Sequence, residues 1–457
     1  MVGGGIAGLV AARALADTTR VVLFEAEARL GGKILTTELE GGVTEAGPDS
    51  FLTRDPHAVR LCEELGLATE LVAPAAFGAH IWIGDRLHPL PSGSVLGVPA
   101  SPAAVMRSGI LSASGAARAL VDLVLPGPLT GPDVSVGSLV RRRFGAEVLE
   151  RLVDPILAGT RAGSADDMSL AAAAPPIDAV ARRHRSVLLG LMHEARTGHA
   201  GPPQFLGLRG GMQRLIERLR ANLLGRVELR CGIPVTRVAQ QQEGYVVETR
   251  EGPVAVSGVV LAAPARETAE LLEKLSPRAA DELRTIEYAS IALVNLVYPP
   301  GAGMLPASGS GILVPSTEGR TLAGCTWTSR KWPHLAPADG GLSFRCFVGR
   351  AGDDPALSLS NDELARRAEE EVRAALGWSA AARTSSVIRW PRAIPQYAVG
   401  HNERMDRVEA ALSACPGVAL AGAGYRGSGL PDCIRQGEEA AQRVLAGITA
   451  GVADVGR

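Results

Sequence analysis

The fold is decided at the start of the chain, where residues 1–8 read Met1-Val2-Gly3-Gly4-Gly5-Ile6-Ala7-Gly8. Gly3, Gly5 and Gly8 fit the pattern G-x-G-x-x-G. The first glycine allows a tight turn, the second lets the backbone approach a pyrophosphate, and the third permits close packing of helix on strand. Residues 9–16 are rich in Ala and Leu and predict a helix, whose N-terminus offers free N–H groups and a positive dipole end to phosphates. This segment therefore predicts a dinucleotide site.

An acidic residue lies at the expected distance beyond this turn. Residues 20–24 form a β-branched apolar run, which predicts a buried strand, and the run ends at Glu25, 22 residues after Gly3. A spacing of about 20 residues places a carboxylate at the ribose hydroxyls of the dinucleotide. The same carboxylate would repel the 2′-phosphate of NADP. An ordinary glycine-rich turn followed by a surface glutamate is the alternative interpretation.

The first strand is unusually short. Only Met1 and Val2 precede Gly3, although such a strand usually has about five residues and lies in the centre of its sheet. A central strand of two residues would leave backbone groups of its neighbours unpaired. We therefore expect that about five apolar residues belong upstream of Met1, because the start codon has been assigned too late. Without them we expect a poorly stable or cofactor-poor protein.

The composition restricts the possible functions. The chain has 457 residues, which is too long for one ordinary core and predicts two or three domains. Its 47 basic and 48 acidic residues give a formal net charge of −1, which argues against nucleic acid as a partner. No apolar run approaches the ~20 residues that a membrane-spanning helix needs, and the N-terminus lacks the features of a signal peptide.

Cysteines and histidines give no indication of a metal or disulfide site. The six cysteines are scattered without a C-x-x-C pair, which is typical of free thiols in a reducing compartment. The eight histidines do not cluster at ligand spacing. We therefore expect a cytoplasmic protein without a bound metal.

The rest of the chain separates into helical and strand-rich regions. Between residues 95 and 200 the pattern is helical, with Pro- and Gly-rich joints between segments 115–125, 136–144, 146–157 and 179–194. After a helix at 212–224, a small antiparallel sheet is predicted from segments 227–230, 235–239 and 245–249, and a strand rejoining the first sheet from 259–263. A second sheet is predicted from segments 286–298, 311–315, 321–328 and 342–348. The chain then continues with a helix at 363–376, a strand at 418–421, a Gly-rich turn and a helix at about 434–446.

A second glycine motif distinguishes flavin from nicotinamide cofactors. The turn Arg29-Leu30-Gly31-Gly32-Lys33 follows Glu25 and is typical of the glutathione-reductase-like FAD domains of amine oxidases, where it brings backbone and a cation close to the diphosphate. A nicotinamide dehydrogenase is disfavoured, because no second G-x-G-x-x-G follows a strand.

Five further segments resemble one family within this class. Residues 45–51 (EAGPDSF), 142–148, 154–163, 390–396 (WPRAIPQ) and 422–434 are similar, in this order, to motifs of the protoporphyrinogen/coproporphyrinogen oxidase family. Plant and mitochondrial members place a propionate-binding arginine where this chain has Ala79, so the chain most resembles the Gram-positive coproporphyrinogen III oxidase branch.

The resemblance implies roles for individual residues. No side chain stands out as a catalytic acid or base, so we name none, and we assign no metal ligand. The resemblance implies FAD contacts at Gly3, Gly4, Gly5, Ile6, Ala7, Gly8, Glu25, Ala26, Lys33, Gly47, Pro48, Asp49, Ser50, Val235, Trp390, Gly429, Leu430 and Pro431. It implies substrate contacts at Gly159, Leu313 and Trp332, although other members often have Phe at the last position, and we add Arg161 as a substrate-binding candidate. Further candidates for binding propionates are Arg54, Arg86, His88, Lys331 and Arg345.

Independently of the resemblance, residues 427–429 precede a predicted helix and can present N–H groups to the pyrimidine edge of a flavin, where negative charge grows on reduction. The expected fold is α/β plus α+β. A glutathione-reductase-like FAD-binding Rossmann domain comprises residues 1–75, 204–272 and 414–457. An interleaved substrate domain with a mixed sheet comprises residues 76–94 and 273–413, and a helical lobe comprises residues 95–203.

The resemblance implies an FAD-dependent oxidation of coproporphyrinogen III to coproporphyrin III in haem biosynthesis, in which six electrons pass to molecular oxygen and hydrogen peroxide is released. Oxidation of protoporphyrinogen IX by the same mechanism is the alternative. A flavin amine oxidase or carotenoid desaturase would share the first motif but gives no reason for segments 45–51 and 390–396, and a non-catalytic porphyrin carrier would keep the fold without turnover. We expect a monomer or homodimer, with peripheral membrane contact possible through residues 100–126.

Overall fold

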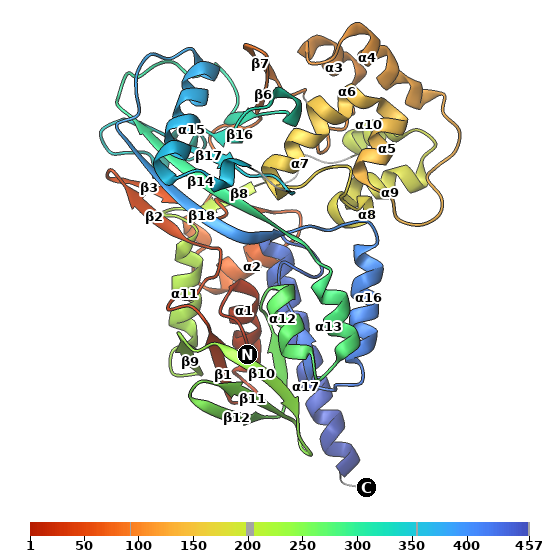
Figure 1. The fold of residues 1–457 in the computed structure, drawn as a ribbon, viewed down its shortest axis with the longest axis vertical. Coiled ribbons are helices and arrows are strands. Elements are labelled where there is room, and N and C mark those ends of the chain that lie inside the picture. Colours follow the sequence, from red (N-terminus) through yellow and green to blue (C-terminus); the bar gives the residue numbers. More distant parts are fainter. Residues whose placement is uncertain (92, 198–204, 353–354, 456–457) are drawn as a thin grey trace.

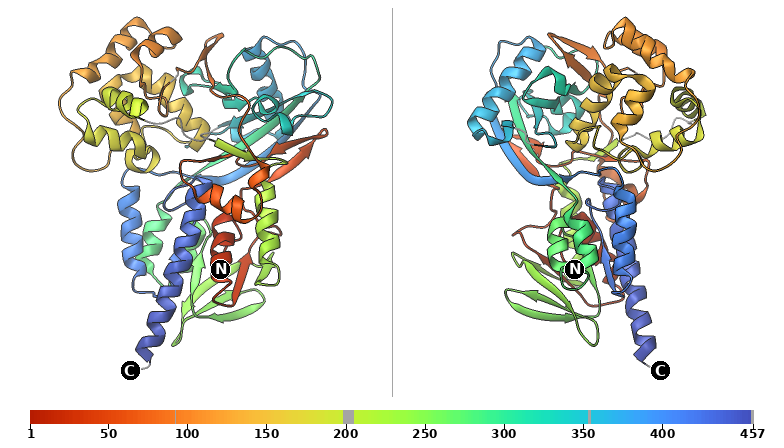
Figure 2. Two further views of the ribbon diagram at one scale, coloured as in Figure 1. Left: turned by 180° about the vertical axis from the view of Figure 1, so that it is seen from behind. Right: turned by 45° about the vertical axis from the view of Figure 1, so that its right-hand side comes forward.

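A computed structural model describes residues 1–91, 93–197, 205–352 and 355–455. The predicted boundary between residues 203 and 204 lies outside the described residues. Figures 1 and 2 show a parallel sheet with its helices at one end of the molecule, and at the other end an all-helical lobe beside a second, larger sheet. The predicted combination of a Rossmann-type domain, a mixed sheet and a helical lobe is confirmed in this arrangement.

The first two residues occupy the central position of the parallel sheet. Val2 bridges to Phe24 in β1 (Val21–Glu25) and to Leu261 in β13 (Val259–Leu261), so that the chain start joins two strand pairs. The N–H of Val2 donates to the carbonyl of Val260 at 2.9 Å, and the N–H of Gly3 donates to the carbonyl of Phe24 at 2.8 Å.

The outer strands of this sheet come from distant parts of the chain. Strand β9 (Val227–Cys231) pairs in parallel with β1, and β19 (Val418–Leu420) pairs in parallel with β13. The prediction that segment 227–230 belongs to the small antiparallel sheet was therefore wrong. That sheet consists of β10 (Val235–Gln240), β11 (Tyr245–Thr249) and β12 (Gly252–Val256), because a turn after Cys231 separates β9 from it.

Successive residues of β1 face opposite sides of the sheet, and both sides are covered. Val21 and Leu23 pack in one core with α1 (Ile6–Leu15), α11 (Gln213–Leu223) and α17 (Leu430–Val455). Val22 and Phe24 pack in the other core, whose helices are α12 (Ala265–Leu272), α13 (Pro277–Arg284) and α16 (His401–Leu412). The sheet is thus buried on both faces, and only its carboxyl edge is available for a ligand.

The second sheet has seven strands. Their order is β18 (Thr384–Pro395), β14 (Tyr288–Tyr298), β17 (Leu342–Val348), β16 (Leu322–Thr326), β15 (Gly311–Leu313), β6 (His80–Ile83) and β7 (Arg86–Pro89). Only β15 and β6 are parallel, so the sheet is mixed as predicted. Helix α15 (Asn361–Leu376) contributes to the core on this sheet through Leu364, Ala368 and Val372.

The helical lobe is more broken than its sequence pattern predicts. Segment 146–157 forms α6 (Ala146–Val148), a π-turn at Leu149–Val153 and α7 (Asp154–Arg161). Segment 179–194 is divided between α9 (Pro175–Arg183) and α10 (Val187–Thr197), because His184 adopts an extended conformation with φ −113° and ψ 142°. None of the described helices combines the length and the apolar character that crossing a bilayer requires.

Candidate cofactor and active site

The N-terminus of α1 forms a cradle with open space in front of it. We call residues 3–8 the nucleotide turn. Gly3 has φ +103°, and a Cβ on Gly8 would lie 2.0 Å from the carbonyl oxygen of Gly3, so only glycine permits this close packing. A Cβ on Gly5 would meet nothing within 4 Å, and among the described residues no side chain caps the helix. The free N–H groups at Ile6 and Ala7 therefore face space that suits a diphosphate.

Glu25 holds the edge of the nucleotide turn. Its Oε2 accepts a hydrogen bond from the N–H of Gly4 at 2.6 Å, and its Oε1 accepts one from the N–H of Glu27 at 2.8 Å. Ala26 is exposed beside it. The N–H of Ile233 donates to the carbonyl of Glu25 at 2.9 Å, which brings Val235, at the start of β10, to the same end of the cradle.

A second glycine turn backs the cradle. Gly31 and Gly32 have φ +105° and +56°, and the N–H of Gly31 donates to the carbonyl of Gly4 at 2.8 Å. Arg29, which the sequence did not single out as a site residue, fixes this turn by donating to the carbonyl of Gly32 at 2.5 Å. Lys33 follows, and burial lowers the pKa of its ammonium, although Cys433 and Glu267 partly oppose this shift; in the described part of the chain no carboxylate forms an ion pair with it. The two phosphates of a dinucleotide would supply the missing negative charge.

Residues 47–50, which we call the Asp49 loop, approach the cradle from the other side. A Cβ on Gly47 would lie 1.9 Å from the carbonyl oxygen of Lys33, so the loop lies directly against the Lys33 backbone. Trp390 on β18 donates its indole N–H to the carbonyl of Ala46 at 2.6 Å. Pro48 and Ser50 flank Asp49, and the hydroxyl of Ser50 donates to Asp49 Oδ1 at 2.8 Å. The second sheet thus holds a loop that the sequence assigned to the cofactor.

The carboxylate of Asp49 is shared by three donors of the second sheet and its connections. Oδ2 accepts from Lys331 Nζ at 2.8 Å and from Trp332 Nε1 at 3.0 Å, and it lies 3.4 Å from Arg345 Nη2. Burial alone would raise the pKa of Asp49, but Arg345 and Lys331 hold it well below its usual value. Arg345 also donates to the carbonyl of Gly47 at 2.9 Å.

This arrangement concerns three residues that the sequence analysis named. Lys331 and Arg345, which are candidates for binding propionates, are both paired with Asp49. Trp332 is only 1% exposed, so its indole packs in the interior.

Glu45 is a buried carboxyl group that sequence reasoning noted only as the first letter of a motif. It ends β3 (Gly42–Glu45), which pairs with β2 (Thr36–Leu39). Its oxygens accept from the N–H of Met212 at 2.6 Å and from the hydroxyl of Thr36 at 2.8 Å. Burial raises the pKa of Glu45 to about 7, although these hydrogen bonds and Arg345 oppose the shift.

Residues 427–429, the C-terminal turn, lie just before α17. Gly427 has φ +110°, and its N–H donates to the hydroxyl of Tyr397 at 3.1 Å, while the same hydroxyl donates to the carbonyl of Ala423 at 2.6 Å. The N–H of Gly429 donates to Asp432 Oδ2 at 3.2 Å. Two of the N–H groups predicted to face a flavin therefore already have partners, and Leu430 and Pro431 begin the helix behind them.

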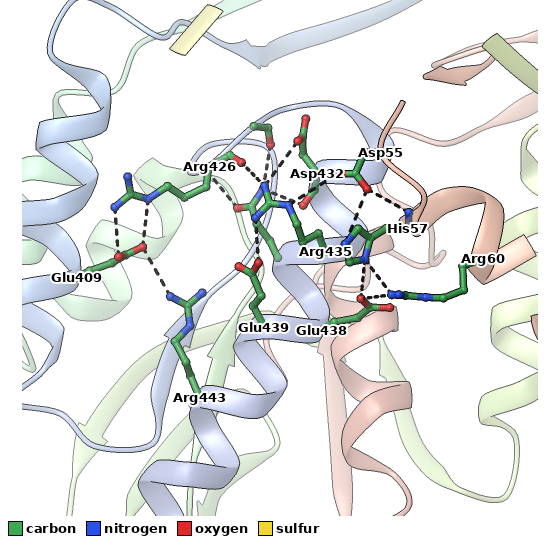
Figure 3. Close-up of polar contacts among 12 residues, drawn as sticks. Asp55, His57, Arg60, Glu409, Arg426, Asp432, Arg435, Glu438, Glu439 and Arg443 are labelled. Atoms are coloured by element: carbon green, nitrogen blue, oxygen red, sulfur yellow. Dashed lines mark hydrogen bonds and ion pairs between the residues drawn. The ribbon is translucent and has the colours of Figure 1, made fainter. Parts of the chain in front are cut away.

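Figure 3 shows how ion pairs connect this end of α17 to the segment that follows the Asp49 loop. Arg435 lies 3.6 Å from Asp432 and 3.8 Å from Asp55. His57 Nδ1 lies 2.8 Å from Glu438 Oε2, and Arg60 donates to the same oxygen at 2.6 Å. These groups are partly exposed, so each pair contributes little by itself, but together they join the two segments.

The residues assigned to the substrate separate into two places. A Cβ on Gly159 in α7 would lie 2.7 Å from Leu313 Cδ2 in β15, so these two residues face each other where the helical lobe meets the second sheet. Arg161, at the end of α7, donates through Nη1 to Ser428 Oγ at 3.2 Å and thus reaches the C-terminal turn. Trp332 lies instead beside the Asp49 loop.

Known proteins with this sequence pattern are flavoenzymes. Residues 6–445 match the family described as flavin containing amine oxidoreductase. The chain is 35% identical to coproporphyrinogen III oxidase of Bacillus subtilis (strain 168), with 97% of each chain covered. It is 32% identical to protoporphyrinogen oxidase of Bos taurus, covering 97% of this chain and 98% of that protein. A solved structure from Exiguobacterium sp. 255-15, assigned as a protoporphyrinogen oxidase, superposes with a TM-score of 0.86 at 31% identity, covering 96% and 97% of the two chains.

The chain belongs to the flavin-containing amine oxidoreductase family. The predicted resemblance to porphyrinogen oxidases, the predicted class of FAD-dependent oxidoreductase and the predicted cofactor FAD are confirmed. The open space at Gly5, the ammonium of Lys33 and the carboxylate of Glu25 fit the diphosphate and ribose of FAD.

Two glycine variants distinguish a glycine needed for packing from a glycine that leaves space for the cofactor. We expect Gly8→Ala to lower both the melting temperature and the FAD content, because its Cβ meets the Gly3 carbonyl. Gly5→Ala should keep the melting temperature of the apoprotein but raise the dissociation constant for FAD about tenfold or more, since its methyl group enters the diphosphate space. Fluorescence titration with FAD measures this, and Gly5→Ala binding FAD as tightly as the unchanged protein would contradict it.

Glu45 makes stability depend on pH. The folded protein binds its proton more tightly than the unfolded chain, with a pKa of about 7 against 4.5, so the free energy of unfolding should decrease as pH rises from about 4.5 to 7. Glu45→Gln should remove this decrease, and Glu38→Gln at an exposed position of β2 should retain it. Urea unfolding across this pH range provides the measurement. Parallel profiles for Glu45→Gln and the unchanged protein would show that the assignment is wrong.

Proposed function

We propose that the protein oxidises coproporphyrinogen III to coproporphyrin III, with molecular oxygen as the acceptor. The observation that carries this proposal is the full-length likeness to the B. subtilis coproporphyrinogen III oxidase, since 97% of both chains is covered. The substrate loses six electrons and six protons, and three molecules of oxygen become three of hydrogen peroxide. FAD accepts the electrons from the macrocycle and passes them to oxygen.

In this proposal, the residues of the chain bind and orient the cofactor and the substrate. The nucleotide turn and Lys33 hold the diphosphate, Glu25 holds the ribose of the adenosine, and the Asp49 loop, Val235, Trp390 and residues 429–431 complete the cofactor site. Gly159 and Leu313 are assigned to the macrocycle, since they meet where α7 faces β15 and a Cβ on Gly159 would lie 2.7 Å from Leu313 Cδ2. Trp332 acts through Asp49, whose position it fixes by a hydrogen bond of 3.0 Å. No general acid or base is assigned.

Protoporphyrinogen IX is the second candidate substrate. It is supported by the 32% identity to the protoporphyrinogen oxidase of Bos taurus. Coproporphyrinogen III has four propionates against two, so it needs more cations at the mouth of the site. Arg54 and Arg86 are exposed and remain candidates for this role, and His88 contacts the carbonyl of Ser108 at 3.3 Å.

We further propose a cytoplasmic location and a monomer or homodimer, with contact to a membrane surface limited to the helical lobe. The division into residues 1–75, 204–272 and 414–457 for FAD, 76–94 and 273–413 for the substrate, and 95–203 for the helical lobe is retained as a proposal. Two hydrophobic cores support the last two units: one is formed by helical residues from Val98 to Leu191 and the other by the second sheet with α15.

Steady-state rates of porphyrin formation test the proposed function. We expect a higher kcat/KM for coproporphyrinogen III than for protoporphyrinogen IX, with hydrogen peroxide released from both. A strong preference for protoporphyrinogen IX would reverse the substrate assignment, and oxidation of neither would leave the carrier or amine oxidase interpretation.

A variant of α7 tests the substrate position. Gly159→Val should lower kcat/KM for the porphyrinogen about tenfold or more with unchanged FAD content, because its side chain meets Leu313. Thr160→Val is the matched control, since Thr160 is exposed and its hydroxyl bonds only to the carbonyl of Ile156 in its own helix. An equal kcat/KM for Gly159→Val and Thr160→Val would show that Gly159 does not contact the substrate.

A further inference from the structure

Arg161 is a partly buried cation where the helical lobe meets the C-terminal turn. It is the last residue of α7, and its carbonyl accepts a hydrogen bond from Gln396 Nε2 at 3.1 Å, which fixes the backbone. The guanidinium donates to Ser428 Oγ at 3.2 Å. Among the described residues no carboxylate lies within ion-pairing distance of it. Most of the five N–H donors of this guanidinium are thus available for another acceptor.

A guanidinium in such surroundings needs an anion. Burial lowers the pKa of Arg161, with a partial opposing effect of Tyr397 and Asp432. The group still remains charged, because arginine does not lose its proton in proteins. Arg161 is partly buried and has no carboxylate within ion-pairing distance, which favours a negative group beside the C-terminal turn.

The packing of α17 on α1 places the C-terminal turn relative to the cradle. A Cβ on Gly437 would lie 2.5 Å from the carbonyl oxygen of Ala7, so Gly437 of α17 is level with the diphosphate-binding end of α1. Leu430 begins α17 seven residues earlier, which at about 1.5 Å per residue is ~10 Å further along. An FAD whose diphosphate lay at the nucleotide turn would direct its flavin toward this end of α17, where Arg161 bonds to Ser428.

Two backbone N–H groups of the C-terminal turn already have partners within the protein. The N–H groups of Gly427 and Gly429 already donate to Tyr397 and Asp432. The Asp432 carboxyl group also brings negative charge to this place when it is ionised. A flavin gains negative charge over N1 and the C2 carbonyl when it takes up two electrons and one proton. The guanidinium of Arg161, which bonds to Ser428 in the same turn, is a further donor at this place.

We propose that Arg161 faces the pyrimidine edge of the flavin and stabilises the negative charge that this edge gains on reduction, with Ser428 orienting the guanidinium. No bond to Arg161 forms, and the electrons come from the substrate or from an added reductant such as dithionite. This assigns Arg161 to the cofactor in place of a propionate. The inference rests on the FAD site and not on the identity of the porphyrinogen.

Sulfite provides a test that needs no substrate. It adds to N5 of an oxidised flavin and places a negative charge on the same pyrimidine edge. We expect Arg161→Met to bind FAD but to raise the dissociation constant for sulfite about 10- to 100-fold, and to lower the flavin midpoint potential. Arg161→Lys should restore most of the affinity, and Ser428→Ala should show an intermediate loss. Arg141→Met is the matched control, since Arg141 lies on the surface of the same lobe and is paired with Asp166 at 2.8 Å.

The outcomes show whether Arg161 acts on the flavin or on the substrate. Unchanged sulfite affinity and potential in both Arg161→Met and Ser428→Ala would overturn the proposal, and a raised KM for the porphyrinogen alone would return Arg161 to the substrate. If Arg161→Met does not retain FAD, the sulfite affinity and the midpoint potential are measured in Arg161→Lys and Ser428→Ala. These two variants then test whether Arg161 stabilises the reduced flavin. A failure of porphyrinogen turnover in the unchanged protein would affect the proposed function but not this result.

Discussion

The contact between Gly8 and the carbonyl of Gly3 is the constraint on which the site depends. A Cβ on Gly8 would lie 2.0 Å from that oxygen, so α1 can start directly at the edge of the parallel sheet only because Gly8 has no side chain. The helix N-terminus is thereby aimed across Gly5 into open space. This contact fixes the position of the N-terminus of α1. Around that N-terminus lie Glu25, Lys33 and the C-terminal turn.

The second constraint is electrostatic and connects the two halves of the molecule. Asp49 belongs to a loop beside the cradle, whereas Lys331 and Arg345 belong to the second sheet and its connections. Because one buried carboxylate is shared by two cations, separating the halves would expose uncompensated charge. Trp332 donates to the same carboxylate, so a residue assigned by resemblance to the substrate lies in the framework that positions the cofactor loop.

The parts of the site that sequence predicts are those set by local spacing. The nucleotide turn, Glu25 and the Gly31-Gly32 turn lie within about 30 residues, and short-range geometry determines their roles. The sequence does not predict that Lys331 pairs with Asp49, because the two residues lie 282 positions apart along the chain. Segment 227–230 was misplaced for a similar reason: its strand pattern does not reveal that β1 is its neighbour. The helix break at His184 was also missed, because the helical pattern of residues 179–194 does not reveal the extended backbone at this residue.

The most direct test of the account is the selectivity of the purified protein for flavins after removal and re-addition of the cofactor. Absorbance and fluorescence titrations with FAD and with FMN measure it. Because Glu25 and the start of β10 form the adenosine end of the site, and because Lys33 needs the charge of a diphosphate, FAD should bind at about one molecule per chain. FMN should bind at least about tenfold more weakly. Equal affinity for FMN, or no binding of FAD, would contradict the cradle as described.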